Sequence, residues 1–562
     1  MFLKSAKLLI ASSLFFSGYA QLKTDPLYFK YPLSITPKLN ANFGEMRPNH
    51  FHMGLDISTE SRENLPLYAP ADGYVSRIKI EQGGFGNALY ISHPNGLTTL
   101  YAHLNRFTTA VQHYLRAKQY ELESWKVDVV VPEEAIQVQK GQLIGYTGNT
   151  GASQGPHLHF EVRDSRTENC YNPLRFDLSI NDAIAPSIYK LAFYDRDKSV
   201  YEQSPIVVPL VKNGKIYKPL SDITLPYKKV FIAIHADDRI NGAANRYGIF
   251  KAALYDQEEL VTSFEMENIG YDKTRYLNGH IDYFRKLMGG PYYQMLFPSM
   301  GFGADIYSPK PSVKFIEIGD SSKAYRIVVS DIFGNESTAG FNLKGNSSIS
   351  AVKSNDINRI QPGTVNFYED ELVRFVFPED AFYDAFNFNY KIAASADRGA
   401  VSFQIQATPE NIPVQNYFDV SIKPDRSGVL LNPDRIIMKR TGRGRTEVKK
   451  ARLEKEFYAA SFRDFGSFQL IQDLEPPTIV SNVFSGKTVT GSTRITIDVA
   501  DNNRVIKDFK ARIDDKWVLF YPTGNRYYYY PDEHFPPGEH KLSVVVIDEA
   551  GNTAAKDWII KR

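Results

Sequence analysis

The chain has 562 residues, which at about 150 residues per domain predicts about four domains. Hydrophobic residues make up 43% of it, so packed cores can form and global disorder is excluded. The 66 basic and 64 acidic residues leave a net charge of +2, which gives no reason to expect a nucleic-acid-binding protein. The 35 Tyr and 36 Phe favour strands over helices.

The beginning of the chain has the pattern of a secretory signal. Lys4 and Lys7 form its charged start, residues 8–16 form an apolar run too short to cross a bilayer, and residues 18–20 include the small residues that signal peptidase reads. We expect the mature chain to begin at Gln21 and to be exported, the alternative being a retained membrane anchor. Because no later segment is long and apolar enough, we expect no transmembrane segment in the mature chain.

From about residue 40 to residue 178 the sequence predicts short strands separated by turns. A His-Pro-Asn-Gly turn at residues 93–96 joins two β-rich runs as a hairpin, and residues 141–162 form a strand, a glycine-rich loop and a strand. This pattern favours antiparallel β-sheet. A helix-prone excursion at about residues 108–137 interrupts it, and a long excursion of this kind is either a lid or groove wall or a solvated decoration.

An internal repeat follows residue 180. Each unit has a Pro-led entry strand, an apolar strand that ends in acidic turn residues, and a strand closed by Asp-x-x-Gly-Asn. The matching segments are residues 182–188 with 473–479, 230–239 with 495–504, and 325–337 with 542–554. The repeat predicts two immunoglobulin-like modules, the first of which carries an insertion around residues 274–294.

A third β-rich unit separates the two repeats, and its basic run at residues 438–455 is interpreted as a solvated loop and strand edge because it lacks interleaved aromatic residues. The predicted fold class is mostly β: an antiparallel β-sheet domain followed by about three β-sandwich (Ig-like) modules. The predicted organisation is a signal peptide (1–20), a first domain (40–178, insertion about 108–137), an Ig-like β module with an insertion (183–345), a β-rich module (346–473) and a C-terminal Ig-like β module (474–562).

Seven of the eleven histidines lie between residues 50 and 160, and two motifs there supply metal ligands. HMGLD at residues 52–56 and GPHLHFE at residues 155–161 contribute His52, Asp56 and His159. Three protein ligands leave the fourth position of a zinc ion open for water, as in hydrolytic rather than structural sites. We therefore expect one Zn²⁺ per chain.

Two further histidines are candidates for proton transfer. Residues i and i+2 of a strand point to the same side, so His157 is expected to face the same cavity as the histidine of the ligand set two positions later. His103, in the segment YAHL, is the second candidate. A neutral histidine can accept the proton of a water molecule, and a charged one can stabilise an oxyanion or protonate a leaving amine. The sequence leaves open which of the two is the general base.

Other residues with reactive side chains are assigned structural roles. His50 and His93 lie near the motifs in sequence, but turn or surface positions are favoured for them. The single cysteine, Cys170, cannot form an internal disulfide and is expected to be buried as a small apolar residue. Five further histidines have no partners that the sequence identifies, and structural or exposed positions are expected for them: His113, His235, His280, His534 and His540. Three glycines, Gly148, Gly151 and Gly155, resemble a phosphate loop, but no Lys-Ser/Thr follows them. We expect them to let their loop approach the cleft closely.

These motifs resemble the lysostaphin/LytM-type zinc metallopeptidases, which are peptidoglycan endopeptidases with a duplicated-hybrid-motif fold. The resemblance covers only about residues 40–175 and is carried by the segments 43–58, 68–75, 84–104 and 141–162. It implies that His52, Asp56 and His159 hold the zinc ion and that His103 and His157 act in catalysis.

The chain departs from that family in the long stretch between His103 and His157, which puts the shape of the cleft and the choice of substrate in question. The tyrosine that the family often uses near the oxyanion is not assigned, with Tyr101 and Tyr146 as candidates. Whether residues 21–40 or the excursion cover the cleft stays open.

The resemblance implies a secreted zinc metalloendopeptidase that hydrolyses peptide cross-links of bacterial peptidoglycan through a zinc-activated water, in the periplasm of a Gram-negative cell or outside the cell. Its expected partners are peptidoglycan peptide stems and a cell-envelope protein bound through the β modules, with no nucleic acid. The alternatives are a catalytically silent cell-wall regulator, against which the five filled positions count, and a binding scaffold that acts through the β modules. The bond that is cut and the oligomeric state stay open.

Overall fold

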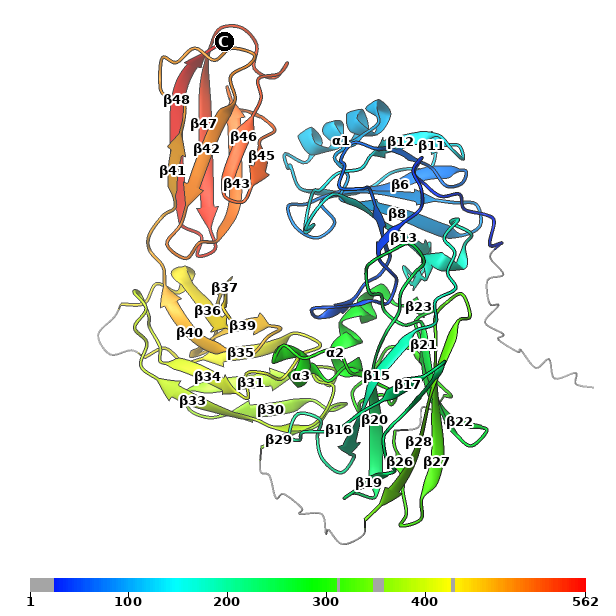
Figure 1. Ribbon diagram of the computed structural model, residues 1–562. Helices are drawn as coiled ribbons and strands as arrows, with labels where there is room; N and C mark the ends of the chain where they lie inside the picture. Colours follow the sequence, from blue (N-terminus) through cyan, green and yellow to red (C-terminus); the bar gives the residue numbers. More distant parts are fainter. Residues whose placement is uncertain (1–24, 311–313, 347–357, 426–429) are drawn as a thin grey trace, which may run out of the picture.

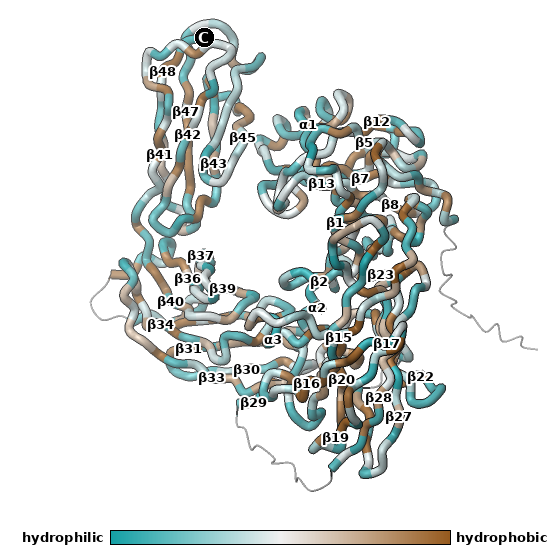
Figure 2. Tube along the Cα trace, viewed as in Figure 1, coloured by the Kyte–Doolittle hydropathy of each residue, from teal (hydrophilic) through white to brown (hydrophobic). Residues whose placement is uncertain are grey.

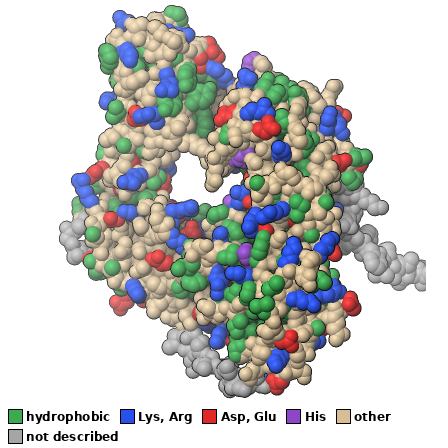
Figure 3. Space-filling view, in the orientation of Figure 1, with side chains coloured by type: hydrophobic (Ala, Val, Ile, Leu, Met, Phe, Trp, Pro, Cys, Tyr) green, Lys and Arg blue, Asp and Glu red, His purple; other side chains and the backbone are tan. Residues whose placement is uncertain are grey.

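The computed structural model describes residues 25–310, 314–346, 358–425 and 430–562, so the predicted signal peptide lies outside the described residues. The chain is mostly β and its sheets are predominantly antiparallel, which confirms the predicted fold class. Figure 1 shows successive β-rich bodies that curve around a central opening, and Figure 3 shows that side chains leave this opening unfilled. Among the described residues, no helix combines the length and apolar character needed to cross a membrane.

The N-terminal domain (residues 25–178) is built on one large antiparallel sheet. The sheet order is β1 (Leu39–Ala41), β4 (Leu55–Ser58), β13 (His157–Asp164), β8 (Leu97–Ala102), β7 (Asn87–Ser92), β6 (Gly73–Ile80) and β10 (Val127–Val130), with β11 (Gln137–Val138) against β6 and β14 (Cys170–Tyr171) against β13. The remaining elements are the small sheet β5 (Pro66–Tyr68), β12 (Leu143–Tyr146) and β9 (Arg106–Phe107), the hairpin β2 (Met46–Arg47) and β3 (His50–Phe51), helix α1 (Thr109–Glu121) and the 3-10 helix η1 (Pro173–Arg175).

The alternation of side chains along β13 gives the large sheet an apolar face and a polar face. Leu158, Phe160 and Val162 are fully buried in the hydrophobic core on one face. The intervening residues, His157 and His159 among them, therefore point to the opposite face. Because β13 lies between β4 and β8 in the sheet, this polar face brings residues from three strands together.

The second module (residues 187–346) contains two sheets. One has β16 (Ile206–Pro209), β15 (Ser187–Asp195), β20 (Lys229–Asp237), β24 (Gln294–Met295) and β26 (Ile316–Glu317); the other has β17 (Val211–Asn213), β18 (Ile216–Lys218), β28 (Glu336–Gly345), β27 (Lys323–Ser330), β21 (Lys251–Asp256), β22 (Glu259–Glu265), β25 (Tyr307–Ser308) and β19 (Ile223–Leu225). Figure 2 shows hydrophobic residues concentrated along β15, β20 and β28.

This second module is joined closely to the N-terminal domain. Its short strand β23 (Asn268–Ile269) pairs with β14 and so extends the large sheet. One hydrophobic core runs through both bodies, from Phe29 to Leu343. The predicted insertion forms the 3-10 helix η2 (Tyr271–Tyr276) and the helices α2 (Leu277–His280) and α3 (Tyr283–Leu287). The domain boundaries drawn from the sequence stay predictions, since no break in the core marks the first of them.

The third module (residues 358–473) and the C-terminal module (residues 474–562) each have their own hydrophobic core. The third contains β29 (Arg359–Ile360), β32 (Phe386–Asn387), β30 (Asn366–Glu369), β31 (Val373–Phe377), β35 (Phe418–Ile422), β39 (Phe457–Phe462), β38 (Arg452–Glu454), β33 (Asn389–Ala393), β34 (Gln404–Thr408), β40 (Ser467–Gln472), β36 (Ile436–Gly442), β37 (Arg445–Lys450) and η3 (Pro433–Arg435). The C-terminal module contains the sheet β41 (Thr478–Ser481), β42 (Ile495–Ala500), β46 (Arg526–Tyr529), β45 (Tyr521–Thr523) and the sheet β44 (Lys516–Trp517), β43 (Ile506–Ile513), β47 (Glu539–Asp548), β48 (Thr553–Lys561).

Helix α1 closes the ring by contacting the C-terminal module. The ring of Tyr120 stacks on that of His534 with centroids 3.9 Å apart, and Arg116 forms an ion pair with Asp532. A second ion pair joins Arg512 to Glu123, two residues after the end of the helix. The excursion at residues 108–137 therefore supplies a docking surface for the C-terminal module, a role that neither interpretation of the sequence included.

Candidate metal centre

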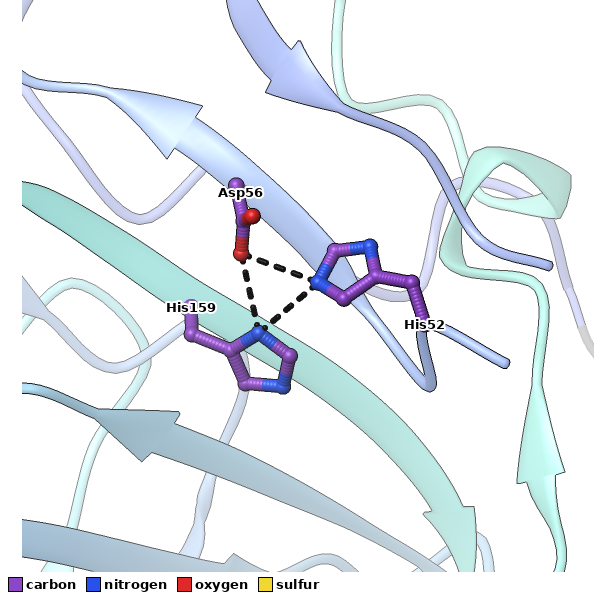
Figure 4. Close-up of side chains that lie close together, drawn as sticks. All are labelled: His52, Asp56 and His159. Atoms are coloured by element: carbon purple, nitrogen blue, oxygen red, sulfur yellow. Dashed lines mark hydrogen bonds and ion pairs between the residues drawn. The ribbon is translucent and has the colours of Figure 1, made fainter. Parts of the chain in front are cut away.

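Three side chains converge on the polar face of the large sheet (Figure 4). His52 follows β3, Asp56 lies on β4, and His159 lies opposite Asp56 on β13. The atoms that face one another are Nε2 of His52, Oδ1 of Asp56 and Nδ1 of His159, separated by 2.9, 3.0 and 3.1 Å. Gly54 makes this possible, because a Cβ there would lie 2.4 Å from the carbonyl oxygen of Phe160.

Hydrogen bonds on the outer side of both imidazoles fix which nitrogen carries the proton. Nδ1 of His52 lies 2.7 Å from the carbonyl oxygen of Asn42, and Nε2 of His159 lies 2.8 Å from the Glu161 carboxylate. Both acceptors require an N–H donor, so the inner nitrogens of neutral rings carry lone pairs. A metal cation between the inner nitrogens and the Asp56 oxygen would take the place of the protons that otherwise join them.

The donor set and its size fit a zinc ion. Zinc binds imidazole nitrogen and carboxylate oxygen at about 2.0–2.2 Å, and tetrahedral geometry then separates the donors by roughly 3.3 Å. The three separations of 2.9 to 3.1 Å are close to that value. His52, Asp56 and His159 are therefore the residues that would hold the ion, leaving its fourth position toward the cleft.

Charge on the polar face is balanced without exposing the ligands. Burial alone would raise the pKa of Asp56, but the neighbouring histidines hold it well below its usual range. Burial opposes ionisation of Glu161 too, yet Arg163 and His159 lower its pKa to about 2. Glu161 is fully buried and receives a hydrogen bond of 2.6 Å from Arg163. The predicted burial of Cys170 is observed, with its thiol 3.5 Å from Glu161.

The two histidines predicted for proton transfer lie beside the donor triangle. Nδ1 of His103 donates to the carbonyl oxygen of Thr150 at 2.7 Å, and Nδ1 of His157 donates to that of Gly155 at 2.8 Å. Their rings lie 4.7 Å apart, and Nε2 of His157 is 3.4 Å from Asp56. Burial, reinforced by the neighbouring histidines, lowers the pKa of His103 to about 4. His103 is therefore neutral at neutral pH and can accept a proton.

All five predicted residues line one cleft of about 780 Å³. Part of its wall comes from the second module, through Tyr271 and Thr274. Thr274 donates a hydrogen bond of 2.9 Å to the carbonyl oxygen of Phe51, and the ring of Tyr271 lies 4.3 Å from the guanidinium of Arg163. The sequence predicts this insertion in the second module, but no residue pattern within the insertion indicates a place in the cleft. None of the described residues that line the cleft comes from the excursion at residues 108–137.

The other residues weighed from the sequence lie outside the donor triangle. His50 lines the cleft, but its Nδ1 bonds the carbonyl oxygen of Pro48 at 3.0 Å. His93 is buried away from the cleft, between the carbonyl of Asp72 and the hydroxyl of Thr99. Tyr101 is fully buried and Tyr146 is absent from the cleft wall, so Tyr271 is the tyrosine that the described chain places there.

Comparison with known families agrees with this geometry. Residues 50–120 and 125–173 match the model of peptidase family M23, and residues 358–473 match that of a Zu5-like domain. The N-terminal domain is thus a peptidase domain of family M23, and the predicted resemblance to lysostaphin/LytM-type metallopeptidases is confirmed. The family match to the third module identifies it as Zu5-like, which the sequence had left as an unnamed β-rich unit.

Curated relatives match this chain over about a fifth to a quarter of its length. It is 37% identical over 112 residues to the DD-carboxypeptidase/endopeptidase Mpg of Neisseria meningitidis, covering 20% of each chain. It is 27% identical over 139 residues to the peptidoglycan DD-endopeptidase ShyA of Vibrio cholerae, covering 24% of this chain and 26% of the relative. A solved zinc-containing peptidase from Vibrio cholerae matches 27% of this chain and 40% of its own, at 26% identity and a TM-score of 0.21. The chain thus spans about a fifth to a quarter of the length of these two curated relatives.

Proposed function

We propose that this protein is an exported zinc metalloendopeptidase that hydrolyses the peptide cross-links of bacterial peptidoglycan. The observation that carries the proposal is the triangle of His52, Asp56 and His159, whose lone pairs converge beside two further histidines in one cleft. The M23 family of the domain supports peptidase activity. The names of the relatives, a DD-carboxypeptidase/endopeptidase and a peptidoglycan DD-endopeptidase, support the substrate class.

In this proposal, histidine side chains of the protein carry out the proton transfers. When bound, the zinc ion would supply a water molecule of lowered pKa and polarise the scissile carbonyl. His103 and His157 hold their Nδ1 protons on backbone carbonyls, so each presents Nε2 to the cleft. Between them they accept the proton of the attacking water and return one to the leaving amine. Asp56 and the two histidine ligands would hold the ion and take no part in these transfers.

The proposed location follows from the substrate. Peptidoglycan lies outside the inner membrane, so the enzyme must be exported, as the signal-like residues 1–20 predict. The relatives from Neisseria meningitidis and Vibrio cholerae are proteins of Gram-negative bacteria, which supports the periplasm. A catalytically silent regulator is the less supported alternative, because all five residues expected of an active peptidase line the cleft.

The test is digestion of purified cross-linked peptidoglycan by the mature protein, with the released fragments identified by mass spectrometry. We expect dimeric muropeptides to fall to monomers, a chelator to stop the reaction and zinc to restore it. His157→Ala should abolish cleavage while zinc stays bound. His50→Ala is the matched control, since His50 lines the same cleft outside the triangle.

Each alternative outcome has a defined meaning. A purified protein that binds no zinc would overturn the enzyme proposal. Activity that survives in the His157→Ala variant would remove only the role assigned to that residue. Release of free peptide from the sugar would show that the amide between peptide and glycan, rather than the cross-link, is the bond that is cut.

A further inference from the structure

Two clusters of three aspartates lie outside the lining of the peptidase cleft, one at each repeat module. In each cluster one carboxylate oxygen from every residue lies within 4.8 Å of the others. The first cluster consists of Asp182, Asp238 and Asp331, and the second of Asp473, Asp501 and Asp548. Asp182 and Asp473 lie in the segments that lead into the second and the C-terminal module, and the other four aspartates lie within those modules.

The two clusters occupy equivalent places in the internal repeat. Asp182 and Asp473 open the Pro-led entry segments, each five residues before the first strand of its module. Asp238 and Asp501 come directly after β20 and β42. The third member begins the Asp-x-x-Gly-Asn turn in both modules. The same arrangement of three carboxylates thus occurs once in each copy of the repeat.

Buried oxygens without partners distinguish these clusters from an ordinary acidic turn. Asp238 is only 3% exposed, yet its Oδ1 has no hydrogen-bond partner. Oδ2 of Asp182 is likewise buried and without a partner. Within the described chain, no ion pair joins Asp182, Asp238 or Asp331 to a lysine, arginine or histidine. A buried carboxylate oxygen without a hydrogen bond or counter-charge is costly, so this pocket of negative charge calls for a cation.

The second cluster repeats these features. Asp548 accepts hydrogen bonds from the backbone N–H and the side-chain amide of Asn552, at 2.8 and 2.9 Å. Asp331 is held in the same way by Asn335, at 2.8 and 2.7 Å. Oδ1 of Asp501 is buried without a partner, as its counterpart in the first cluster is. The amide locks orient the third carboxylate of each cluster, and Asp473 is oriented in the same way by the side-chain amides of Asn502 and Asn503. The oxygens without partners, on Asp182 and Asp238 in the first cluster and on Asp501 in the second, are the ones free for a ligand.

We propose that each cluster binds one calcium ion. Donor sets made only of oxygen suit calcium, magnesium or manganese rather than zinc. Magnesium demands near-octahedral geometry and keeps several waters, whereas calcium accepts six to eight oxygens in irregular arrangements. Two of the three carboxylates in each cluster are buried and the third is half-buried, which leaves little room for a shell of retained waters and favours calcium. The sites are independent of the proposed peptidase activity.

Both sites lie at joints of the ring. Asp182 and Asp473 stand in the segments that enter their modules from the preceding domain. The loop that begins at Asp238 is closed by backbone hydrogen bonds to Tyr247, whose hydroxyl donates to the carbonyl oxygen of Leu39 in the peptidase domain at 2.8 Å. Near the second cluster, the N–H of Lys450 in the third module donates to Glu549, beside Asp548, at 3.1 Å. Calcium would therefore stiffen the joints on which the ring depends.

The direct test is calorimetric titration of calcium chloride into the full mature chain, which is first freed of calcium with EGTA, then separated from the EGTA and loaded with one equivalent of zinc. We expect two calcium ions per chain. Asp238→Asn and Asp501→Asn should each leave one. The matched controls Asp237→Asn and Asp498→Asn should keep both, because Asp237 pairs with Arg246 and Asp498 pairs with Arg526, outside the clusters.

Thermal unfolding of the same variants separates binding from a merely structural role. Calcium should raise the melting temperature of the wild type by a few degrees, because it binds the folded state. In EGTA, Asp238→Asn should melt no lower than the wild type, since it removes a buried carboxylate without a counter-charge; in calcium it should melt lower. The proposal is overturned if no binding is detected at about 5 mM calcium, if Asp238→Asn keeps both ions, or if it is equally destabilised in both buffers.

Discussion

Glu161 accepts a hydrogen bond from Nε2 of His159 at 2.8 Å, two residues further along the same face of β13. Arg163, again two residues on, holds the other oxygen of that carboxylate at 2.6 Å. One strand thus supplies a metal ligand, the carboxylate that orients it and the cation that keeps the carboxylate ionised. A carboxylate behind a ligating histidine fixes its tautomer and increases its basicity.

Replacing this carboxylate should weaken zinc binding without unfolding the domain. Glu161→Gln keeps the size of the side chain but removes the charge that faces His159 and Arg163. We expect zinc affinity, measured by competition with a chelator, to fall by about 10- to 100-fold. Glu168→Gln is the control, because Glu168 bonds Arg163 at 2.7 Å without touching His159. Equal affinities for the two variants would show that Glu161 has no effect on the metal.

Tyr271 should affect substrate binding rather than metal binding. It reaches the cleft from the second module and is not one of the three residues of the donor triangle. Removing the ring in Tyr271→Ala takes away part of one wall, so we expect KM for a cross-linked muropeptide to rise several-fold. The zinc content and kcat should change little. Asp272→Ala, on the neighbouring exposed side chain, should leave KM unchanged; a KM unaffected by Tyr271→Ala would remove this residue from the substrate site.

The sequence predicts those parts of the site that depend on local pattern. The alternation of apolar and polar residues on β13 was enough to place His157 and His159 on one face. Their meeting with Asp56 requires the pairing of β4 with β13, which came from the family resemblance rather than from periodicity. Tyr271 could not be found in this way, because its place depends on how a 3-10 helix of another module packs against β3.

The contact between α1 and the C-terminal module, which closes the ring, could not be predicted from local sequence pattern either. Arg116 and Asp532 form an ion pair across 416 residues of sequence. Helix α1 was recognisable as helix-prone, but its surface residues carry no periodic pattern that identifies a partner. Such contacts depend on the relative placement of modules, which neither propensity nor spacing encodes.

Weakening the contact between α1 and the C-terminal module should open the ring. Tyr120→Ala removes the stack on His534 and the edge contact with Trp517, leaving mainly the ion pairs of Arg116 and Glu123. Ion pairs that remain partly exposed contribute little. We expect a larger radius of gyration in small-angle X-ray scattering. Lys118→Ala should leave the scattering unchanged, because the ion pair of Lys118 with Glu121 lies within α1; identical curves for both variants would contradict the prediction.

The buried His280 should make stability depend on pH. Its ring bonds the hydroxyl of Tyr307 at 2.8 Å, and burial lowers its pKa to about 3. In the unfolded chain it takes up a proton below about pH 6.5, so between these values the unfolded state binds more protons and stability falls as the pH falls. The contribution approaches about 1.4 kcal/mol per pH unit. In His280→Gln the melting temperature should therefore fall less between pH 7 and pH 5 than in the wild type. His113→Gln, at an exposed position on α1, should follow the wild type; a wild-type slope in His280→Gln would show that this residue does not set the pH dependence.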